Sequence, residues 1–343
     1  MRYIKKIGIL LGIALVLQLS VLLYIEKYYL VEKKDIGSDN LTKQRGKNGE
    51  LGKVKIPKTA EHIEVSGDGR YVAYYEDTDL KVVNVDTLEV SKMKFEDNTK
   101  VSLFKWVPGK ERIILGGKQE DKYKSSIIFA YLDLKEKDNY KALGTINLSD
   151  KKSEASEIEC SDSDNVVYVK INSTGSRNSI YRLNGNGSVE KIQLKNYSIG
   201  NIEIMKKEDK LLYEDSALNK IYTYGTGKTI DMKGLGKVRL LSVDKEDNIY
   251  IAQIENDKVK KMYWGKQSKS VEQWDSVVPK EEIDIKDIKF NMDGRVFVNN
   301  DLKGLVTEIS TGKETYYKGT FLKLYSEGVA SISDDYLIKT KYK

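Results

Sequence analysis

From about residue 51 onward, apolar and polar residues alternate with a period of two rather than 3.6. Short segments rich in Val, Ile and Tyr, such as Arg70–Glu76, Asn165–Ile171 and Asn248–Ile254, are separated by Gly, Asn, Asp or Ser turns. This pattern is typical of strands joined by hairpins. No amphipathic helical pattern interrupts it, so we predict an all-β region.

The strands recur as a repeated phrase, clearest over Ile63–Met93. Further copies begin near Phe104, Ile158, Ile202, Leu241, Ile288 and Leu322, which makes seven. The 293 residues after position 50 (343 − 50) allow about 42 per copy. Four-stranded propeller blades take about 40–45 residues. We therefore predict an all-β, seven-bladed β-propeller over residues 51–343.

The last copy offers only three strands, and residues 53–57 precede the first copy as a spare strand. A ring closes firmly when its last blade borrows a strand from the other end of the chain, since no sheet edge then stays open. We predict that residues 53–57 pair with residues 336–342 and complete the seventh blade.

The N-terminal segment has a different pattern, because Ile7–Ile25 are 19 residues without a charge. A helix of this length spans about 28 Å, close to the hydrocarbon thickness of a bilayer. A cleaved signal peptide would have a shorter apolar core and small residues after it. We expect an uncleaved transmembrane anchor, a signal anchor, at 7–25. A basic cytoplasmic tail (residues 1–6) would precede it, and a polar tether (26–50) would follow. The propeller would then lie outside the cytoplasm, held at the cell membrane by a single span.

Short motifs within the repeats point to a known group of proteins. Ser66-Gly-Asp-Gly-Arg70 and Asn291-Met-Asp-Gly-Arg295 each precede an apolar strand, and Val107-Pro-Gly-Lys110 is a shortened relative. These phrases resemble the repeats of TolB-like and WD-repeat-like propellers. They are also similar to the propeller domain of dipeptidyl-peptidase-IV-type proteins. The resemblance covers about 290 residues without the catalytic domain, so it implies a fold and no activity.

Composition narrows the choice of partners. The formal charge of +6 is spread among mixed Lys, Glu and Asp, whereas nucleic-acid binders gather their basic residues in a patch. We expect a solvated surface and no nucleic-acid partner. One cysteine, Cys160, excludes an internal disulfide, and its apolar surroundings predict a buried side chain.

The chain lacks the residues of the common catalytic centres. Its one histidine, His62, lies at the start of a strand, and we interpret it as structural or solvated. There is no G-x-S-x-G elbow, no His/Cys zinc set and no phosphate loop at Gly225–Lys228. We considered Ca²⁺ at Asp162, Asp164, Asp244 and Asp247, but turn chemistry explains these residues better. We expect no cofactor, no metal and no enzymatic activity.

Three functions remain open. The first is a non-catalytic binding or scaffold module for a protein, peptide or envelope polymer near the membrane. The second is a sensory or regulatory subunit of a membrane complex, with Gly8-x-x-x-Gly12 as a weak helix-packing motif. The third is a glycan-acting enzyme that uses paired carboxylates in the channel.

One residue stands between the two apolar residues of each innermost strand and should point toward the propeller axis. These seven residues form a predicted ring of three Glu, three Lys and one Ser: Glu64, Lys105, Glu159, Glu203, Ser242, Lys289 and Lys323. Charges at an axis must pair or stay hydrated. The ring is then either a structural plug or a ligand site with Glu64, Glu159 and Glu203 as acceptors.

Overall fold

The computed structural model describes residues 6, 18, 42–45, 53–77, 79–94, 99–122, 124–135, 140–161, 166–175, 177–208 and 210–343. Two compact units are defined, Met1–Ile36 and Gly37–Lys343. In the first unit only Lys6 and Gln18 are described, both with helical backbone. The predicted anchor at 7–25 and most of the predicted tether at 26–50 therefore lie outside the described residues. Within the described part, no helix is both long and apolar enough to cross a bilayer.

Seven antiparallel sheets make up the second unit, and each is one blade. The strands of blades 1 to 3 are β2 (Glu61–Val65), β3 (Tyr71–Glu76), β4 (Asp79–Asn84) and β5 (Glu89–Lys94); β6 (Thr99–Trp106), β7 (Arg112–Glu120), β8 (Ser125–Asp133) and β9 (Tyr140–Asn147); and β10 (Glu154–Cys160), β11 (Val166–Ser173), β12 (Arg177–Asn184) and β13 (Val189–Lys191). Blade 4 comprises β14 (Ile199–Ile204), β15 (Leu211–Asp215) and β16 (Lys220–Thr223). The strands of blades 5 to 7 are β17 (Lys237–Val243), β18 (Ile249–Glu255), β19 (Lys258–Gly265) and β20 (Asp275–Val277); β21 (Ile288–Phe290), β22 (Val296–Asn300), β23 (Leu305–Glu308) and β24 (Glu314–Tyr316); and β25 (Thr320–Tyr325), β26 (Gly328–Ser333) and β27 (Tyr336–Lys341). Two short 3-10 helices, η2 (Val271–Gln273) and η3 (Ile285–Asp287), lie in blade 5 and before blade 6.

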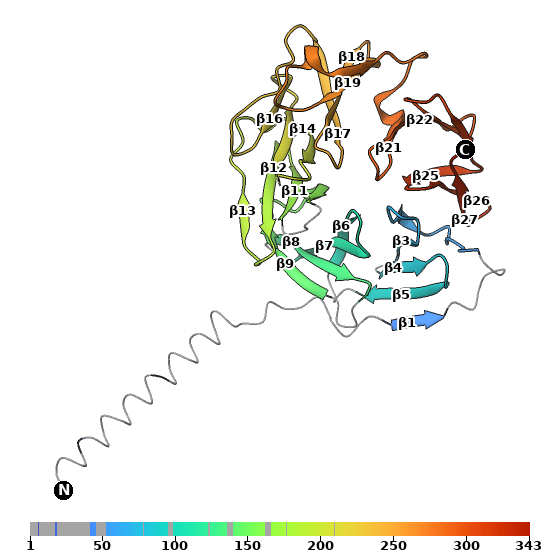
Figure 1. Ribbon diagram of the computed structural model, residues 1–343. Helices are drawn as coiled ribbons and strands as arrows, with labels where there is room; N and C mark the ends of the chain where they lie inside the picture. Colours follow the sequence, from blue (N-terminus) through green and yellow to red (C-terminus); the bar gives the residue numbers. More distant parts are fainter. Residues whose placement is uncertain are drawn as a thin grey trace. The chain divides into compact units, whose positions relative to one another are not determined.

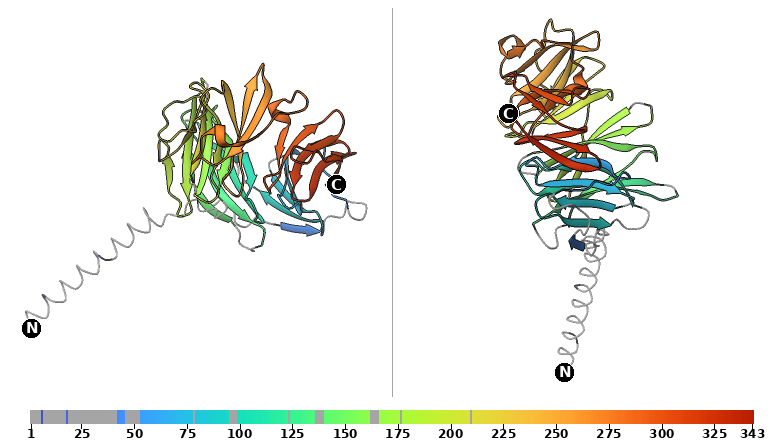
Figure 2. Two further views of the ribbon diagram at one scale, coloured as in Figure 1. Left: turned by 45° about the horizontal axis from the view of Figure 1, so that its top comes forward. Right: turned by 90° about the vertical axis from the view of Figure 1, so that its right-hand side faces the viewer.

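The sheets stand around a common axis, with the first strand of each blade innermost (Figures 1 and 2). The predicted seven-bladed all-β propeller is confirmed. Because every strand pairs antiparallel with the next, the turns leave the ring at two faces. We call the face with the first-to-second and third-to-fourth connections the top face. The base face carries the second-to-third turns and the connections between blades.

The core lies between blades rather than inside any one sheet. One cluster joins Tyr131 and Leu143 of blade 2 to Ile158, Cys160 and Val169 of blade 3. Cys160 is buried, as predicted. A sheet that is apolar on both faces suits this stacking, because each blade is covered by a neighbour on either side.

The turns follow the predicted chemistry. Gly69 and Gly294 have positive φ angles of 73° and 81°, which a side chain would oppose. Asp68 caps the first turn by accepting the Arg70 amide at 3.0 Å. In blade 6 the capping residue is Asn291, whose Oδ1 accepts the Asp293 and Arg295 amides, rather than the Asp of the motif.

The innermost strands are not regular. Six of the seven carry a shift of register against their second strand, as between Leu240 and Ser242 in β17. Such a bulge re-aims the side chains that follow it. In blade 5 the bulge leaves Leu240 fully buried and the next residue, Leu241, half-buried.

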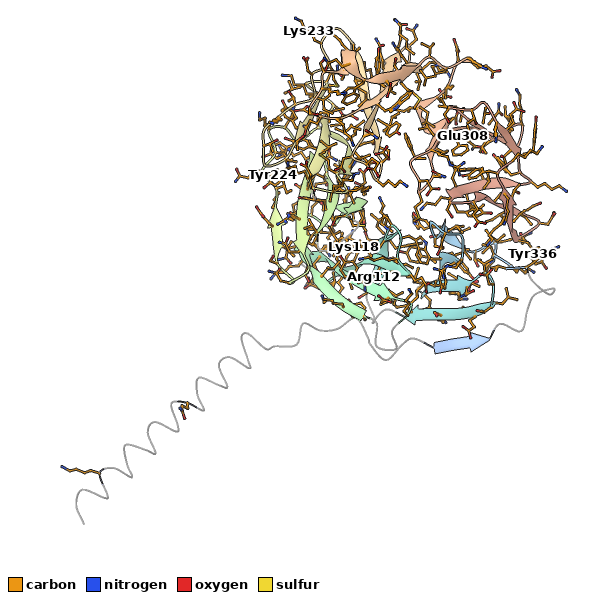
Figure 3. The ribbon with its side chains drawn as sticks, in the orientation of Figure 1. Arg112, Lys118, Tyr224, Lys233, Glu308 and Tyr336 are labelled. Carbon is orange, nitrogen blue, oxygen red and sulfur yellow. The ribbon has the colours of Figure 1, made fainter. Side chains whose placement is uncertain are left out.

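The two ends of the propeller sequence meet in blade 7. Lys55 bridges Tyr336, the Leu337 amide donates to the Val54 carbonyl at 2.9 Å, and the Ile56 amide donates to the Asp335 carbonyl at 2.8 Å. Val54 and Ile56 are buried beneath this pairing. The predicted closure is confirmed, and Figure 3 labels Tyr336 at this seam.

One strand was not predicted. Within the presumed tether, Thr42–Arg45 form β1, which adds a fifth strand to blade 1 by pairing with β5. The sequence TKQR has no apolar alternation, so periodicity could not reveal it. A polar strand of this kind suits the outermost position, where neither face has a core to cover.

Candidate functional site

The seven residues of the predicted ring, the axial ring, all lie on the innermost strands β2, β6, β10, β14, β17, β21 and β25. Each is near the end of its strand that leads to the top face. Glu159 is buried and the other six are half-buried. The structure therefore brings them to one level around the axis, and their pairing differs from blade to blade.

Two ion pairs neutralise one side of the ring. The Lys105 ammonium binds the Glu159 carboxylate between blades 2 and 3, where only 8% of the Glu159 side chain is exposed. Lys323 Nζ lies 3.5 Å from Glu64 Oε2 between blades 7 and 1, with more than a third of each side chain exposed. Both pairs join neighbouring blades, so blade 7 is linked to blade 1 and blade 2 to blade 3 at the axis.

Glu203 in blade 4 has a different environment. Within the described part of the chain its carboxyl group makes no hydrogen bond and no ion pair. Burial, reinforced by the Glu159 carboxylate, raises the pKa of Glu203 to about 8, although Lys206 and Lys105 oppose the shift. The raised pKa favours the protonated form of this carboxyl group, which can donate a hydrogen bond.

Lys105 responds to both carboxyl groups. Burial alone would lower the pKa of its ammonium group, but Glu159 and Glu203 outweigh this cost and the pKa rises. Glu157 lies two residues before Glu159 in β10. Burial raises the pKa of Glu157 despite its ion pair with Lys170 at 2.6 Å. The ionisable groups at this part of the axis thus influence one another's protonation.

The remaining ring members stay apart from these pairs. Lys289 Nζ donates to the Lys286 carbonyl at 2.6 Å and lies 5.7 Å from the centre of the Phe321 ring. The Ser242 hydroxyl group makes no hydrogen bond among the described residues. Blades 4, 5 and 6 therefore present an acid, a hydroxyl and a cation that do not neutralise one another.

Top-face loops of blades 6, 7, 1 and 2 contact one another. Met292 of blade 6 lies against Gly67 of blade 1, where an added Cβ would collide with its sulfur, and near Gly109 of blade 2. The Ser326 amide of blade 7 donates to the Gly67 carbonyl at 2.8 Å. Blade 6 of the unpaired side thus takes part in this crossing, whereas blades 4 and 5 do not contribute to these contacts.

Sequence reasoning missed a second set of polar residues, on the second strands. Lys118 donates to the Lys151 carbonyl at 2.7 Å, and Lys170 donates to the Gly200 carbonyl at 2.8 Å (Figure 3 labels Lys118). Glu214 accepts the Leu240 amide at 3.2 Å and binds Arg239. Each fastens one blade to the next. A lone charge in an otherwise apolar strand, as in VVYVKI, would have been the signal.

The other candidate residues have structural positions. His62 has a positive φ of 49° and packs edge-on against Tyr75, with ring centres 5.5 Å apart. Asp244 accepts the Glu246 and Asn248 amides, which is turn chemistry. Asp162 and Asp164 lie outside the described residues. Among those that are described, no three His, Cys, Asp or Glu side chains gather as a metal site.

A pocket of about 280 Å³ lies at the outer edge between blades 4 and 5. Its lining includes Asp231, Lys233, Lys261, Tyr263 and Trp274 (Figure 3 labels Lys233). Lys261 lies over the Tyr263 ring at 4.8 Å, and the Trp274 indole donates to the Lys266 carbonyl at 3.0 Å. The lining is balanced in charge and its aromatic groups are already engaged within the protein.

Comparison with known proteins supports the fold. No family model and no curated protein matches this chain. A structure of the mitotic checkpoint complex contains a similar chain, with a TM-score of 0.51, 8% identity and coverage of 91% of this chain and 94% of the other. A structure from work on two prolyl endopeptidases has a TM-score of 0.53 and 14% identity, covering 77% of this chain and 42% of that one. The WD40 domain of SCAP from fission yeast has a TM-score of 0.44 and 13% identity, covering 83% of this chain and 85% of that one.

These likenesses define the class of protein and nothing narrower. The chain is a seven-bladed β-propeller, and it spans less than half the length of the prolyl endopeptidase chain. At such low identity the shared feature is the fold alone.

Proposed function

We propose that this chain is a membrane-anchored, extracytoplasmic β-propeller that binds a protein, peptide or envelope polymer without catalysis. The 19 uncharged residues at 7–25 support the anchor, and the short basic tail supports an outward-facing propeller. The repeat motifs still favour kinship with TolB-like and dipeptidyl-peptidase-IV-type propellers. In this proposal the propeller is a rigid receptor held close to the membrane.

One observation carries the proposed binding site, namely that the axial ring is neutralised on only one side. A purely structural ring would pair its charges throughout, because half-buried charges without partners destabilise the fold. Glu203 and Ser242 instead keep their hydrogen-bonding capacity. An amine or hydroxyl group of a partner would hydrogen-bond to Glu203 and Ser242. Glu159, which is paired with Lys105, would be a second acceptor.

We also propose that the protein is not an enzyme. Its one histidine packs edge-on against Tyr75. The described carboxyl groups near the axis are engaged with lysines or raised in pKa by burial, rather than arranged as a separated acid–base pair. The same groups are suited to holding a partner.

The test is partner capture by crosslinking in native membranes with the full chain. We expect the Glu159→Gln/Glu203→Gln double variant to lose at least tenfold of the crosslinked partner, while Glu314→Gln on the outer strand β24 keeps it. Equal capture by both variants, with the fold intact, would make the axial ring structural only. Turnover of envelope polysaccharide that disappears in the double variant would favour the glycan-acting enzyme instead.

A further inference from the structure

Large apolar side chains exposed to solvent are concentrated on one face of the propeller. Among the described residues there are six, with exposed fractions between 41% and 101%; three belong to base-face loops, and Val278 begins the connection that descends from β20 along β19 to the base face. Tyr197 lies between blades 3 and 4, Leu218 in the β15–β16 turn, Val278 between blades 5 and 6, and Leu302 in the β22–β23 turn. Leu302 is fully exposed. The other two lie elsewhere, Met292 in a top-face turn and Tyr316 on the outer strand β24.

Each of the four has an exposed lysine one or two positions away. The pairs are Lys195 with Tyr197, Lys220 with Leu218, Lys280 with Val278 and Lys303 with Leu302. Within the described part of the chain, Lys220, Lys280 and Lys303 make no ion pair, and Lys195 lies 4.9 Å from the centre of the Tyr222 ring. Glu281 and Glu282 follow Lys280, so that loop is the least basic of the four.

This arrangement favours a bilayer over a folded protein as the occupant. A protein interface needs a contiguous apolar centre, whereas these side chains stand on separate loops of blades 4, 5 and 6 and the connection before blade 4. A lipid surface accepts each side chain singly, at the boundary between headgroups and acyl chains. Neighbouring lysines then reach the phosphates while their stems stay in the apolar layer.

The course of the chain supports the same face. Thr42 of β1 pairs with Lys92, toward the end of β5 that leads to the base face, and Arg45 pairs with Glu89 at its other end. β1 therefore runs along blade 1 in the direction from the base face to the top face. Sixteen residues separate Ile25 from Thr42, a length whose root-mean-square reach as a flexible coil is about 22 Å.

We propose that the base face of blades 4 to 6 rests on the surface of a phospholipid bilayer, with the four apolar side chains in the headgroup region and the four lysines at the phosphates. The proposal rests on the proposed membrane anchor, because a short tether keeps the local lipid concentration high enough for four small contacts to hold. It fixes the orientation of the propeller and leaves the top face free for a partner.

The test uses the full chain in nanodiscs of phosphatidylcholine and phosphatidylglycerol, with one cysteine at Leu302→Cys or at Met292→Cys carrying an environment-sensitive fluorophore. The native Cys160 is buried, and the unsubstituted chain measures any label that it takes. Spin-labelled headgroups should quench the fluorophore at position 302 at least threefold more than at position 292. Replacing Lys220, Lys280 and Lys303 by Glu in the Leu302→Cys chain should reduce this quenching by half or more.

Equal quenching at positions 302 and 292, or none at either, would overturn the docked face. Quenching at 302 that survives the three lysine replacements would overturn the role of the lysines. The anchor is judged separately by extraction at alkaline pH. If the chain leaves the nanodiscs, the anchor fails, and the same labelled chains are mixed with vesicles of the same lipids. Quenching selective for position 302 would then support the face without the anchor, and its absence would reject both.

Discussion

The two sides of the axial ring occupy the same position in the repeat and differ in chemistry. On blades 7, 1, 2 and 3 the ring residues alternate in charge, Lys323 with Glu64 and Lys105 with Glu159, so each finds a partner on a neighbour. On blades 4, 5 and 6 the alternation ends, because Glu203 follows Glu159 and Ser242 follows Glu203. The order of charges around the ring, rather than their number, decides which groups remain available.

The comparison also separates stability from binding. An ion pair between blades compensates the two charges that it buries, whereas an unpaired carboxylate at the axis lowers the stability of the folded state. Burial and the neighbouring Glu159 carboxylate raise the pKa of Glu203 and so favour its neutral form, although Lys206 and Lys105 oppose this shift. We therefore expect the paired side to determine stability and the unpaired side to determine what is bound.

The largest effect should come from the seam within the paired side. Deleting residues 336–343 removes all of β27, including Tyr336 and Leu337, which pair with Lys55 and Val54. We expect a loss of more than about 5 kcal/mol, because a blade edge and its core are both exposed. Urea unfolding followed by circular dichroism should show no cooperative transition. A chain that still unfolds cooperatively near the wild-type midpoint would mean that the seam is dispensable.

Next in size is the deep ion pair. Lys105→Met leaves the buried Glu159 carboxylate without its cation and beside Glu203, which should cost about 3–5 kcal/mol. The matched control is Lys323→Met, whose exposed pair with Glu64 should cost less than about 1 kcal/mol. Denaturant midpoints measure both. Similar losses for the two variants would show that depth at the axis does not matter.

The smallest expected effect lies on the unpaired side and depends on pH. The folded-state pKa of Glu203, about 8, is higher than its ordinary value of 4.5. The folded chain therefore binds this proton more tightly, and stability falls as pH rises from about 4.5 to 8. Glu203→Gln should stabilise the protein by about 1–3 kcal/mol at pH 8.5 and leave it unchanged at pH 4.5. A variant equally or less stable than wild type at pH 8.5 would reject a buried acid at this position.

Much of the architecture could be predicted from the sequence. Alternation and seven recurring phrases were enough for the blades and for the pairing of residues 53–57 with β27, because both depend on local pattern. The bulges of the inner strands were not predicted, since the extra residue of a bulge, as in blade 5, leaves no periodic signal. β1 was missed because an outer polar strand needs no apolar face.

The candidate site was less predictable. The seven ring positions follow from strand register, but their partners depend on distances between blades that no pattern encodes. The interblade contacts of Lys118, Lys170 and Glu214 were missed for the same reason, although a charge inside an apolar strand such as β11 marks a buried polar contact. The proposed anchor falls outside the described residues and stays a prediction.

The seam has a consequence for the order in which the chain can fold. Val54 and Ile56 are made early, but Tyr336 and Leu337, which cover them, are nearly the last residues to be made. Joining Lys55 to Tyr336 closes a loop of about 280 residues, at an entropic cost of about 5 kcal/mol. Until the seam forms, the apolar residues of blade 1 that face blade 7 remain exposed to solvent. A chain threaded across a membrane would therefore assemble its blades in sequence and become a ring only after translocation is complete.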